Sequence, residues 1–473
     1  MPRDYKFMVD FVVVGLGYGD EGKGTITDFL ARSHDTKLVI RYNGGPQAAH
    51  NVVNPQGLWH CFSQVGSASL IPSTFTYLSE YMILDLLALE NETKALAEKG
   101  INDTFQRIYV HPYCPIVTPY HQSLNKIREL RRGTENHGSC GMGVGEIYKD
   151  LKEPDRSILR AGDLHEFQNF SEKFHAIRGV KIEMAENLLS ESNQAIRVEL
   201  DAMKKFDVSF LLSKYSNLQR LLQKNILPIQ DIPSQNQKLI IYEGAQGILL
   251  DEKYGFYPYI TPSNTTTGNA EIIHNRFPRN HLKKIGVSRC FATRHGKGPF
   301  VTEETQLSQL LQDKYNVYGK WQGEFRFGWL DLISLRYSLE CTNGVDEMTF
   351  TNLDQFQKLS QFQVCVEYRI ETKYCDGGLG KYFKFTKNKK ELRIHQILKN
   401  GSLSLEERDK LTQILFKVKP VYKGFPAWDF VIQNGSLHPN LKSWIQFMES
   451  EQGIKQTVSI ISFGQSSQDK IIL

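Results

Sequence analysis

Short apolar runs that end in glycine-rich turns recur along the chain. The first run covers residues 8–14 (MVDFVVV), and it leads into the loop 15–24 (GLGYGDEGKG) and the segment 25–33 (TITDFLARS), which has the pattern of a helix. Apolar, β-branched runs of this length are typical of buried strands. The order strand, glycine-rich loop, helix therefore predicts the opening of an α/β nucleotide-binding fold.

The same pattern returns through the rest of the chain. A third glycine-rich loop covers residues 137–145, and a helix is predicted at 119–132 and another from Trp329. In open α/β sheets, ligands bind at the carboxyl ends of the strands. We therefore predict an α/β fold with a central, mostly parallel sheet flanked by helices. The further strands are predicted within 37–42, 238–243, 283–290, 346–351 and 458–462.

Length and motif positions give different predictions for the domain count. The 473 residues suggest about three domains on length alone. The glycine motifs, however, run from Gly15 to Gly464, so we expect one large domain over 1–473 with small subdomain insertions. The lysine-rich stretch 381–401 predicts one such peripheral insertion, at 376–415. A nucleic-acid surface there is the less favoured reading, because charge runs are usually solvated faces.

Composition excludes several classes of function. The chain has 57 basic and 52 acidic residues, and a net charge of +5 gives no case for a nucleic-acid-binding surface. No run approaches the roughly 18 apolar residues of a membrane span. The seven cysteines show no Cys-x-x-Cys or zinc-type spacing. We expect a cytoplasmic protein that binds small molecules and neither nucleic acid nor membrane.

The first glycine-rich loop carries the strongest chemical signal. From Gly17 to Lys23 it resembles a P-loop, but position 24 is glycine where a P-loop has a magnesium-binding hydroxyl. Its acidic pair, Asp20 and Glu21, would repel phosphates unless it binds metal or acts as a base. Backbone N–H groups and the helix N-terminus can still hold an anion. The alternative is a structural glycine turn with a solvated Lys23.

A second candidate comes from the turn after the second predicted strand. His50 lies eight residues beyond Tyr42 in the segment NGGPQAAHN. A lone histidine is more often structural than catalytic. Two glycine turns at adjacent strand ends favour function instead, with Asp20 and His50 facing one pocket as base and acid.

Motif blocks along nearly the whole chain carry a family resemblance. In order, they resemble those of adenylosuccinate synthetase, and the fold expected from the resemblance is the P-loop-like fold of that family. The blocks are GDEGKG (19–24), RYNGGPQAAH (41–50), PYHQSLNKIRELRRG with GSCGMGVGEIY (119–148), LRAGDL (159–164), YEGAQGILLD (242–251), YPYITPSNTTTGNA (257–270), RHGKGPF (294–300), FGWLDLISLR (327–336), TNLD (351–354), VYKGFPAW (421–428) and ISFG (461–464).

The resemblance implies a ligase that joins IMP and aspartate. GTP is the implied co-substrate, and Mg²⁺ is the implied metal ion. The purine 6-oxygen attacks the γ-phosphate, and the amine then displaces the phosphate. Asp20 would take the purine N1 proton and coordinate Mg²⁺, with the carbonyl of Ala49 as a further ligand. His50 would donate to the leaving GDP, and Lys23 would hold phosphate.

The resemblance also implies binding residues for each substrate. Asp354 would accept the guanine N–H groups, and an arginine near Arg156 would reach across a homodimer interface. The GTP set is Gly19, Glu21, Gly22, Gly24, Asn352, Asp354, Ser462 and Gly464. The purine monophosphate set is Gln47, Cys140, Arg156, Gln246 and Thr261, and the amino-acid set is Gly323, Glu324 and Arg326.

Departures from the family pattern gather on the substrate side. Cys140 and Met142 stand where the family has threonine and arginine, and Glu324 and Phe325 replace two arginines of the amino-acid loop. Gln47, Ala49 and Asn352 replace Asn, Gly and Lys. Asp20, Lys23 and His50 remain. Three readings therefore stay open: the ordinary synthetase, a paralogue with another 6-oxopurine nucleotide or amine, and a non-catalytic nucleotide-binding protein.

Overall fold

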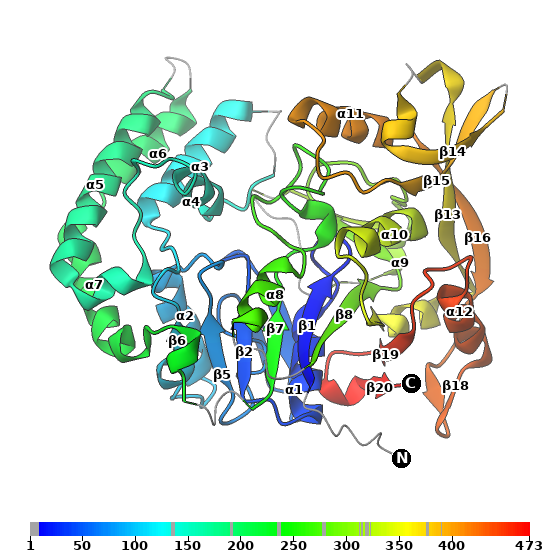
Figure 1. Cartoon of the computed structure of the whole chain (residues 1–473), viewed down its shortest axis with the longest axis horizontal. Helices are drawn as coiled ribbons and strands as arrows, with labels where there is room; N and C mark the ends of the chain where they lie inside the picture. Colours follow the sequence, from blue (N-terminus) through cyan, green and yellow to red (C-terminus); the bar gives the residue numbers. More distant parts are fainter. Residues whose placement is uncertain are drawn as a thin grey trace. The chain divides into compact units, whose positions relative to one another are not determined.

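The computed structural model describes residues 9–133, 138–189, 193–233, 238–276, 281–311, 313, 316, 321, 323–374, 378–388 and 390–473 (Figure 1). The chain divides into two compact units, each assembled from distant segments. Unit 1 comprises Met1–Asp10, Gly24–Ala245 and Asn269–His281; unit 2 comprises Phe11–Lys23, Gln246–Gly268 and Leu282–Leu473. The single domain over 1–473 stays a prediction.

Unit 1 contains four parallel strands in the order β7-β2-β5-β6. β2 (Leu38–Arg41) is fully buried, as its run of apolar residues predicts. The strands β7 (Ile240–Glu243), β5 (Phe75–Leu78) and β6 (Ile108–Val110) complete the row. The hairpin of β3 (His50–Val53) and β4 (Trp59–Phe62) pairs separately.

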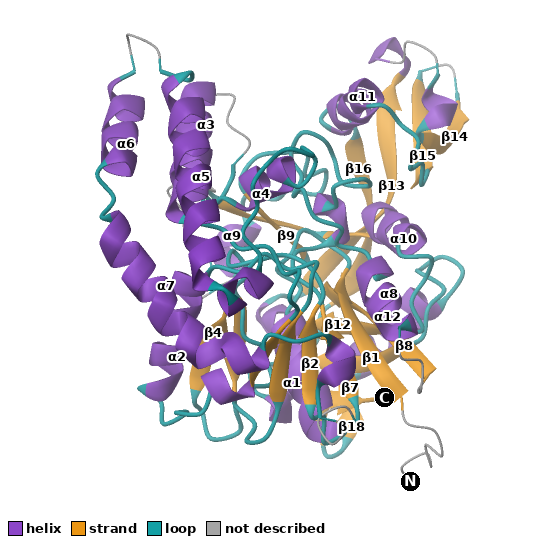
Figure 2. Cartoon of the chain, turned by 60° about the vertical axis from the view of Figure 1, so that its left-hand side comes forward, coloured by secondary structure: helices purple, strands orange, loops and turns teal. Residues whose placement is uncertain are grey.

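Helices account for most of the remaining core of unit 1. α3 packs against α5 and α6 (Figure 2), and aromatic side chains fill the space between them. α3 ends at Gly133, which has a positive φ of 55°, so the predicted stop signal is confirmed. The helices are α1 (Lys23–Ser33), α2 (Leu86–Ala97), α3 (Pro119–Arg132), α4 (Val144–Asp150), α5 (Phe167–Glu186), α6 (Gln194–Lys204), α7 (Val208–Leu222) and α8 (Gly268–Asn275).

Unit 2 contains a second row of strands in the order β1-β8-β12-β19-β20. β12 pairs in parallel with both β8 and β19, and β20 is antiparallel to β19. The predicted α/β class with a mostly parallel sheet flanked by helices is confirmed. The bounds are β1 (Val9–Gly15), β8 (His281–Arg289), β12 (Glu347–Thr351), β19 (Val458–Ser462) and β20 (Lys470–Ile472).

A second sheet in unit 2 runs β11-β13-β15-β14, with β16 also paired to β13. The lysine-rich stretch forms β14 and β15, and Leu392, Ile394 and Ile397 of β15 are buried on one face. Residues 376, 377 and 389 of the predicted insertion lie outside the described residues. The bounds are β11 (Leu330–Asp331), β13 (Gln361–Glu371), β14 (Phe383–Lys387), β15 (Glu391–Ile397) and β16 (Lys419–Pro426).

The helix predicted from Trp329 begins later than the sequence pattern indicated. Leu330 and Asp331 form β11, which pairs with β13, and α10 starts at Leu332. The Asp331 carboxylate accepts hydrogen bonds from the N–H groups of Ile333 and Ser334, at 3.0 and 3.2 Å, and so caps the helix. The predicted start was therefore wrong by three residues.

The remaining elements of unit 2 are short. A ribbon of β9 (Ala292–His295) and β10 (Phe325–Gly328) is antiparallel, and α9 (Leu307–Leu310) is a single turn. Helices α11 (Leu405–Leu415) and α12 (Pro439–Glu449) flank the sheets, and β17 (Ile432–Gln433) pairs with β18 (Ser436–Leu437). Among the described residues, no helix is both long and apolar enough to cross a membrane.

Candidate active site

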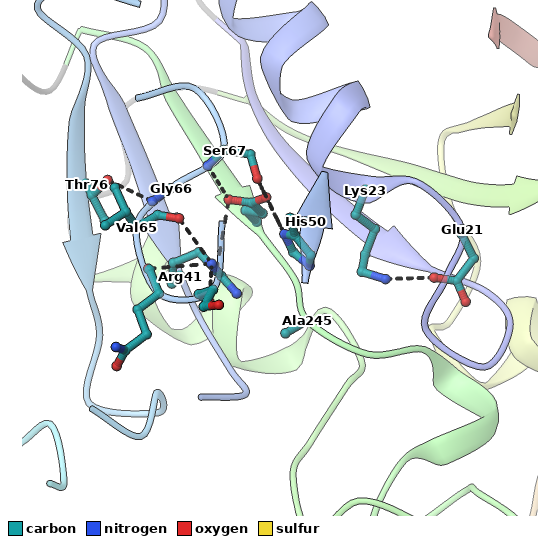
Figure 3. Close-up of polar contacts among 12 residues, drawn as sticks. Glu21, Lys23, Arg41, His50, Val65, Gly66, Ser67, Thr76 and Ala245 are labelled. Atoms are coloured by element: carbon teal, nitrogen blue, oxygen red, sulfur yellow. Dashed lines mark hydrogen bonds and ion pairs between the residues drawn. The ribbon is translucent and has the colours of Figure 1, made fainter. Parts of the chain in front are cut away.

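The first glycine-rich loop folds around its own glutamate. Glu21 Oε1 accepts hydrogen bonds from the N–H groups of Gly17 and Gly19, at 2.9 and 2.7 Å. Glu21 Oε2 lies 2.7 Å from Lys23 Nζ, which also donates to the Gly19 carbonyl (Figure 3). A Cβ on Gly15 would overlap the Glu21 carboxylate, so a larger residue there would displace that side chain. Lys23 is buried, so the prediction of a solvated Lys23 is wrong, and the structural role of the turn stays an alternative.

Asp20 follows in the same loop and is also enclosed. Its Oδ2 lies 3.8 Å from Nε2 of His295, and Arg289 donates to its backbone carbonyl. Burial raises the pKa of Asp20, and the charges of His295, Arg289 and Lys23 partly offset that rise. A buried carboxylate of raised pKa is a stronger base when ionised than an exposed one.

The predicted amino-acid loop runs beside this carboxylate. In the ribbon, Phe325 stands opposite His295, and their rings lie 4.6 Å apart. Arg326 binds Glu303 at 2.8 Å and donates to the Gly298 carbonyl at 3.0 Å.

The other two amino-acid residues of this loop have different surroundings. Glu324 is exposed, and its carbonyl accepts from the N–H of Gly296. Gly323 has a positive φ of 85°, which favours glycine. Gln322 lies outside the described residues.

A cavity of about 50 Å³ opens next to Asp20 within unit 2. Its apolar lining includes Tyr18, Phe291, Phe300 and Leu335. Its polar lining adds Glu21, Ser288, Arg289, Thr293, Thr302, Asp331 and Ser334. The cavity therefore connects the glycine-rich loop with the ribbon and the start of α10.

The segments predicted to bind guanine meet at the carboxyl ends of two neighbouring strands of the unit 2 sheet, and this end of the sheet is called the edge below. β12 ends at Thr351 and β19 at Ser462, and the two strands are parallel neighbours. Asn352 adopts a left-handed conformation with φ of 62°. Thr351 Oγ1 donates to the backbone carbonyl of Glu21 at 2.7 Å, which ties this edge to the glycine-rich loop. Burial raises the pKa of Asp354.

The other end of this edge is built by the C-terminal residues. Ser462 is buried, and its hydroxyl lies 3.4 Å from the Gly464 carbonyl. Lys470 also donates to that carbonyl, at 3.1 Å. A Cβ on Gly464 would overlap the carboxylate of Asp469, so glycine is required there.

The EGAQG turn also approaches the glycine-rich loop within unit 2. A Cβ on Gly19 would lie 3.4 Å from the Cα of Gln246, and Gln246 itself has a positive φ of 58°. Gln246 Oε1 is buried without a hydrogen-bond partner among the described residues. Thr261 donates its N–H to the Leu250 carbonyl at 2.7 Å. The unused amide oxygen fits the predicted role of Gln246 in binding a ligand.

His50 belongs to unit 1, where a buried carboxylate holds it. Its Nδ1 lies 2.6 Å from Oε1 of Glu243, and Ser67 donates its hydroxyl to the same oxygen (Figure 3). The Ser67 N–H donates to Glu243 Oε2 at 3.0 Å, and Nε of buried Arg41 lies 3.9 Å from that oxygen. A Cβ on Gly24 would lie 2.7 Å from the His50 Cβ, so the start of α1 packs on this histidine.

The charge of Glu243 is strongly stabilised. Burial acts to raise its pKa, but His50, Arg41 and the hydrogen bonds from His50 and Ser67 outweigh burial and lower it to about 2. Glu243 is therefore ionised at neutral pH and fixes the imidazole through Nδ1. Sequence reasoning missed Glu243, Ser67 and Arg41, although a carboxylate at the end of the strand before GAQG was a signal.

The unit 1 residues predicted to bind the purine monophosphate lie in separate segments of that unit. Cys140 sits in a loop pinned to α3, where Asn125 accepts from the Ser139 hydroxyl at 2.9 Å. Burial raises the pKa of the Cys140 thiol. Arg156 is half-buried. His137 at the start of this predicted loop lies outside the described residues.

The glycine-rich turn after β2 carries two predicted site residues, Gln47 and Ala49, and these two differ in burial. The Oε1 atom of Gln47 is buried and has no hydrogen-bond partner among the described residues. Ala49 is exposed.

Comparison with known proteins assigns the family. The family model for adenylosuccinate synthetase matches residues 12–471. The chain belongs to the adenylosuccinate synthetase family. Adenylosuccinate synthetases of Halothermothrix orenii and Clostridium novyi are each 31% identical, covering 97% and 98% of this chain and 97% and 99% of the relatives. The predicted family is thus confirmed, and the chain is a ligase of this type.

Solved structures agree on the fold. The fully ligated adenylosuccinate synthetase of Plasmodium falciparum is 24% identical, with a TM-score of 0.75 over 98% of this chain and 99% of that chain. The succinoaminodeoxyadenylate synthetase of cyanophage S-2L, bound to dGMP and dATP, is 15% identical, with a TM-score of 0.56 over 99% and 96%. At these identities the likeness shows the fold.

The residues present fit the magnesium ion that the adenylosuccinate synthetase family implies. The described residues contain no group of three or more His, Cys, Asp or Glu side chains placed to hold a metal. Mg²⁺ is usually held by one or two carboxylates together with substrate phosphates, so a full protein cage is not needed. The half-buried Asp20 carboxylate is a suitable hard oxygen donor for such an ion.

Proposed function

We propose that this chain is a GTP- and Mg²⁺-dependent ligase that phosphorylates the 6-oxo group of a purine nucleotide and displaces the phosphate with an amine. IMP is the default nucleotide and aspartate the default amine, as in the family. The observation that carries the proposal is the half-buried carboxylate of Asp20 inside a phosphate-binding type of loop. A homodimer in the cytoplasm is part of the same proposal.

Asp20 acts as the base in the first step. The purine 6-oxygen becomes a good nucleophile as N1 loses its proton, and the Asp20 carboxylate accepts that proton. The charges of His295 and Arg289 lower the pKa of this half-buried carboxylate, although desolvation outweighs them and the pKa is raised overall. The electron pair freed at N1 allows O6 to bond to the γ-phosphorus, and the β–γ bridging bond breaks.

His50 serves the leaving group. Glu243 accepts from Nδ1 and so fixes the imidazole, and the proposed donation to the departing GDP is assigned to Nε2. The ionised Glu243 stabilises positive charge on the imidazole, as a donor requires. Asp20 and the carbonyl of Ala49 would hold Mg²⁺, which when bound would neutralise negative charge on the phosphates. Lys23 is proposed to hold phosphate within the loop that Glu21 shapes.

The remaining nucleotide contacts keep their predicted roles. The edge formed by Asn352, Asp354, Ser462 and Gly464 would bind guanine, because a carboxylate accepts both guanine N–H donors. Gln246, with its unused amide oxygen, would contact the purine monophosphate. Thr261, Gln47, Cys140 and Arg156 complete that proposed set.

A second candidate differs only in the purine nucleotide. Cys140 and Met142 occupy the pinned loop where the family pattern has threonine and arginine, so the surroundings proposed for the monophosphate are altered. A solved relative of the same fold is bound to dGMP. GMP and dGMP are therefore the alternative acceptors.

Turnover with defined nucleotides tests both candidates. The purified full chain is incubated with GTP, Mg²⁺ and aspartate, and with IMP, GMP or dGMP in parallel, while phosphate release and product mass are followed. Adenylosuccinate formed from IMP supports the first candidate, and product formed only from GMP or dGMP supports the second. Nucleotide binding without turnover under any pairing would leave the non-catalytic reading in place.

A further inference from the structure

A closed set of contacts within unit 2 leads from the backbone of Asp20 back to its own carboxylate, and it is called the Asp20 network below. Arg289, at the end of β8, donates from Nε to the Asp20 carbonyl. Its guanidinium also donates to Oδ2 of Asp313 at 2.9 Å. The side chains of Arg289 and Asp313 are each 10% exposed, so this ion pair is largely shielded from water.

Asn316 connects Asp313 with the imidazole of His295. Its Nδ2 donates to Asp313 Oδ2 at 3.0 Å, and its backbone N–H donates to Oδ1 of the same carboxylate at 3.1 Å. Because an ionised carboxylate only accepts, these bonds fix the orientation of the Asn316 amide. The Oδ1 atom of Asn316 lies 3.2 Å from Nε2 of His295, and since an amide oxygen only accepts, Nε2 carries a proton.

His295 closes the Asp20 network at the carboxylate. Its Nε2 lies 3.8 Å from Asp20 Oδ2, which is within the range of an ion pair and longer than a hydrogen bond. The Nδ1 atom of His295 is buried and has no hydrogen-bond partner among the described residues, so the imidazole is held through Nε2. The part of the chain that the structure describes donates no hydrogen bond to the Asp20 carboxylate, so electrostatic attraction orients this group.

Phe325 packs against two members of the Asp20 network. It stands opposite His295 in the ribbon, where the centres of the two rings lie 4.6 Å apart. The Arg289 guanidinium lies 5.9 Å from the centre of the same phenyl ring. The phenylalanine that stands where the family pattern has an arginine therefore supports both basic neighbours of Asp20.

We propose that His295 is a positioning residue for Asp20 and keeps its carboxylate oriented for removal of the purine N1 proton. The inference rests on the proposed function, because it concerns the base of that same reaction. Asn316 and Asp313 connect the imidazole to Arg289, which binds the backbone of Asp20. The base is thus held at its carbonyl and at its carboxylate, and His295 itself takes no proton from the substrate. Precise orientation of this kind is worth up to about 100-fold in rate for a displacement of about 1 Å.

Replacing His295 tests this role on the full chain. His295→Leu removes the N–H at Nε2, whereas His295→Gln keeps an N–H donor at a similar distance from the backbone. At saturating GTP and Mg²⁺, kcat of His295→Leu should fall by about tenfold to 100-fold, while KM for GTP changes by less than about twofold. The kcat of His295→Gln should stay within about threefold of the wild type. An equal loss of kcat in both variants would overturn the proposal, because the loss would then follow from the missing ring and not from the missing donor.

Isotope exchange isolates the step that needs the base. GTP labelled with ¹⁸O at the β–γ bridge is incubated with IMP, GMP or dGMP and no amine, and scrambling into the β non-bridging positions reports phosphoryl transfer. The scrambling rate of His295→Leu should fall by about tenfold or more. A wild-type scrambling rate in this variant overturns the role of His295 and leaves the ligase function standing. Absence of both scrambling and product with the wild-type chain contradicts the proposed function, and the role of His295 falls with it.

A variant of Asn316 tests the network without touching His295. Asn316→Leu removes the oxygen that accepts from Nε2 and keeps a side chain of similar size. The imidazole loses its anchor, so kcat and the scrambling rate should both fall by about threefold or more. Wild-type values of both would show that Asn316 and Asp313 do not transmit the orientation of Asp20, and would overturn that part of the proposal.

His395→Leu is the matched control. His395 belongs to β15, and its Nδ1 lies 3.2 Å from Oε2 of Glu367, so it forms another histidine–carboxylate pair of unit 2. This variant should keep the wild-type kcat and scrambling rate, and melting curves establish that each variant is folded at the assay temperature. A loss in His395→Leu equal to that in His295→Leu would overturn the proposal, because any lost histidine–carboxylate pair would then have the same effect.

Discussion

Replacing Glu243 by glutamine should disable His50 while preserving the shape of its surroundings. The carboxylate is fully buried, accepts from His50 and twice from Ser67, and lies beside Arg41. A glutamine has one acceptor oxygen and one NH₂ group. One of the present donors therefore faces another donor in the variant, and the imidazole loses its ionised partner.

The stability cost follows from the pKa of Glu243. Its fall from 4.5 to about 2 corresponds to on the order of 3 kcal/mol at about 1.4 kcal/mol per unit. Because the folded-state pKa is the lower one, this contribution is present above pH 4.5 and is lost as the pH falls towards 2. The melting temperature of Glu243→Gln should therefore drop clearly at pH 7 and approach that of the wild type at acidic pH.

The catalytic cost should be larger than the effect on substrate binding. General acid catalysis contributes about 10²–10⁴-fold, so kcat of the variant should fall within that range while KM for GTP changes little. Steady-state kinetics with the nucleotide that turns over, together with melting curves from pH 8 down to about pH 2, give both quantities.

Glu92→Gln provides the matched control. Glu92 is also a buried carboxylate of unit 1 and accepts the N–H groups of Ser63 and Gln64, but burial raises its pKa to about 7 in spite of these bonds. Glu92→Gln should retain the wild-type kcat, because none of the hydrogen bonds described for Glu92 involves His50. Wild-type kcat in Glu243→Gln, or an equal loss in Glu92→Gln, would refute the assignment of Glu243 as the residue that positions His50.

Three further changes test other parts of the site. Asp20→Asn should abolish turnover while calorimetric GTP binding survives, and wild-type rates in that variant would overturn its role as the base. Gly15→Ala should cost about 1–3 kcal/mol and weaken GTP binding, because the new Cβ displaces Glu21; Gly179→Ala on α5, which has open space around it, should be neutral or stabilising in melting curves. Chelation with EDTA should stop phosphate release and leave the melting temperature unchanged, since the described residues hold no structural metal cluster; a lower melting temperature would contradict this.

The strands and glycine turns were predictable because their signals are local. The apolar run before Gly15 and the stop at Gly133 depend on residues next to each other in sequence, and the structure confirms both. The start of α10 was wrong because Asp331 pairs with β13, more than thirty residues further on. Glu243 was missed for the same reason, since 193 residues separate it from His50. Pairings of this length leave no periodic trace in the sequence.

The Glu21 carboxylate explains why a glycine-rich loop with an acidic pair is compatible with phosphate chemistry. In a P-loop, backbone N–H groups cradle phosphate. Here the N–H groups of Gly17 and Gly19 already bind Glu21, and Lys23 neutralises that carboxylate. The acid inside the loop is thus balanced by the loop itself, and the neighbouring Asp20 is left to face the cavity. A loop of this kind presents a base beside the site proposed for phosphate, which is what a reaction that begins by removing a proton requires.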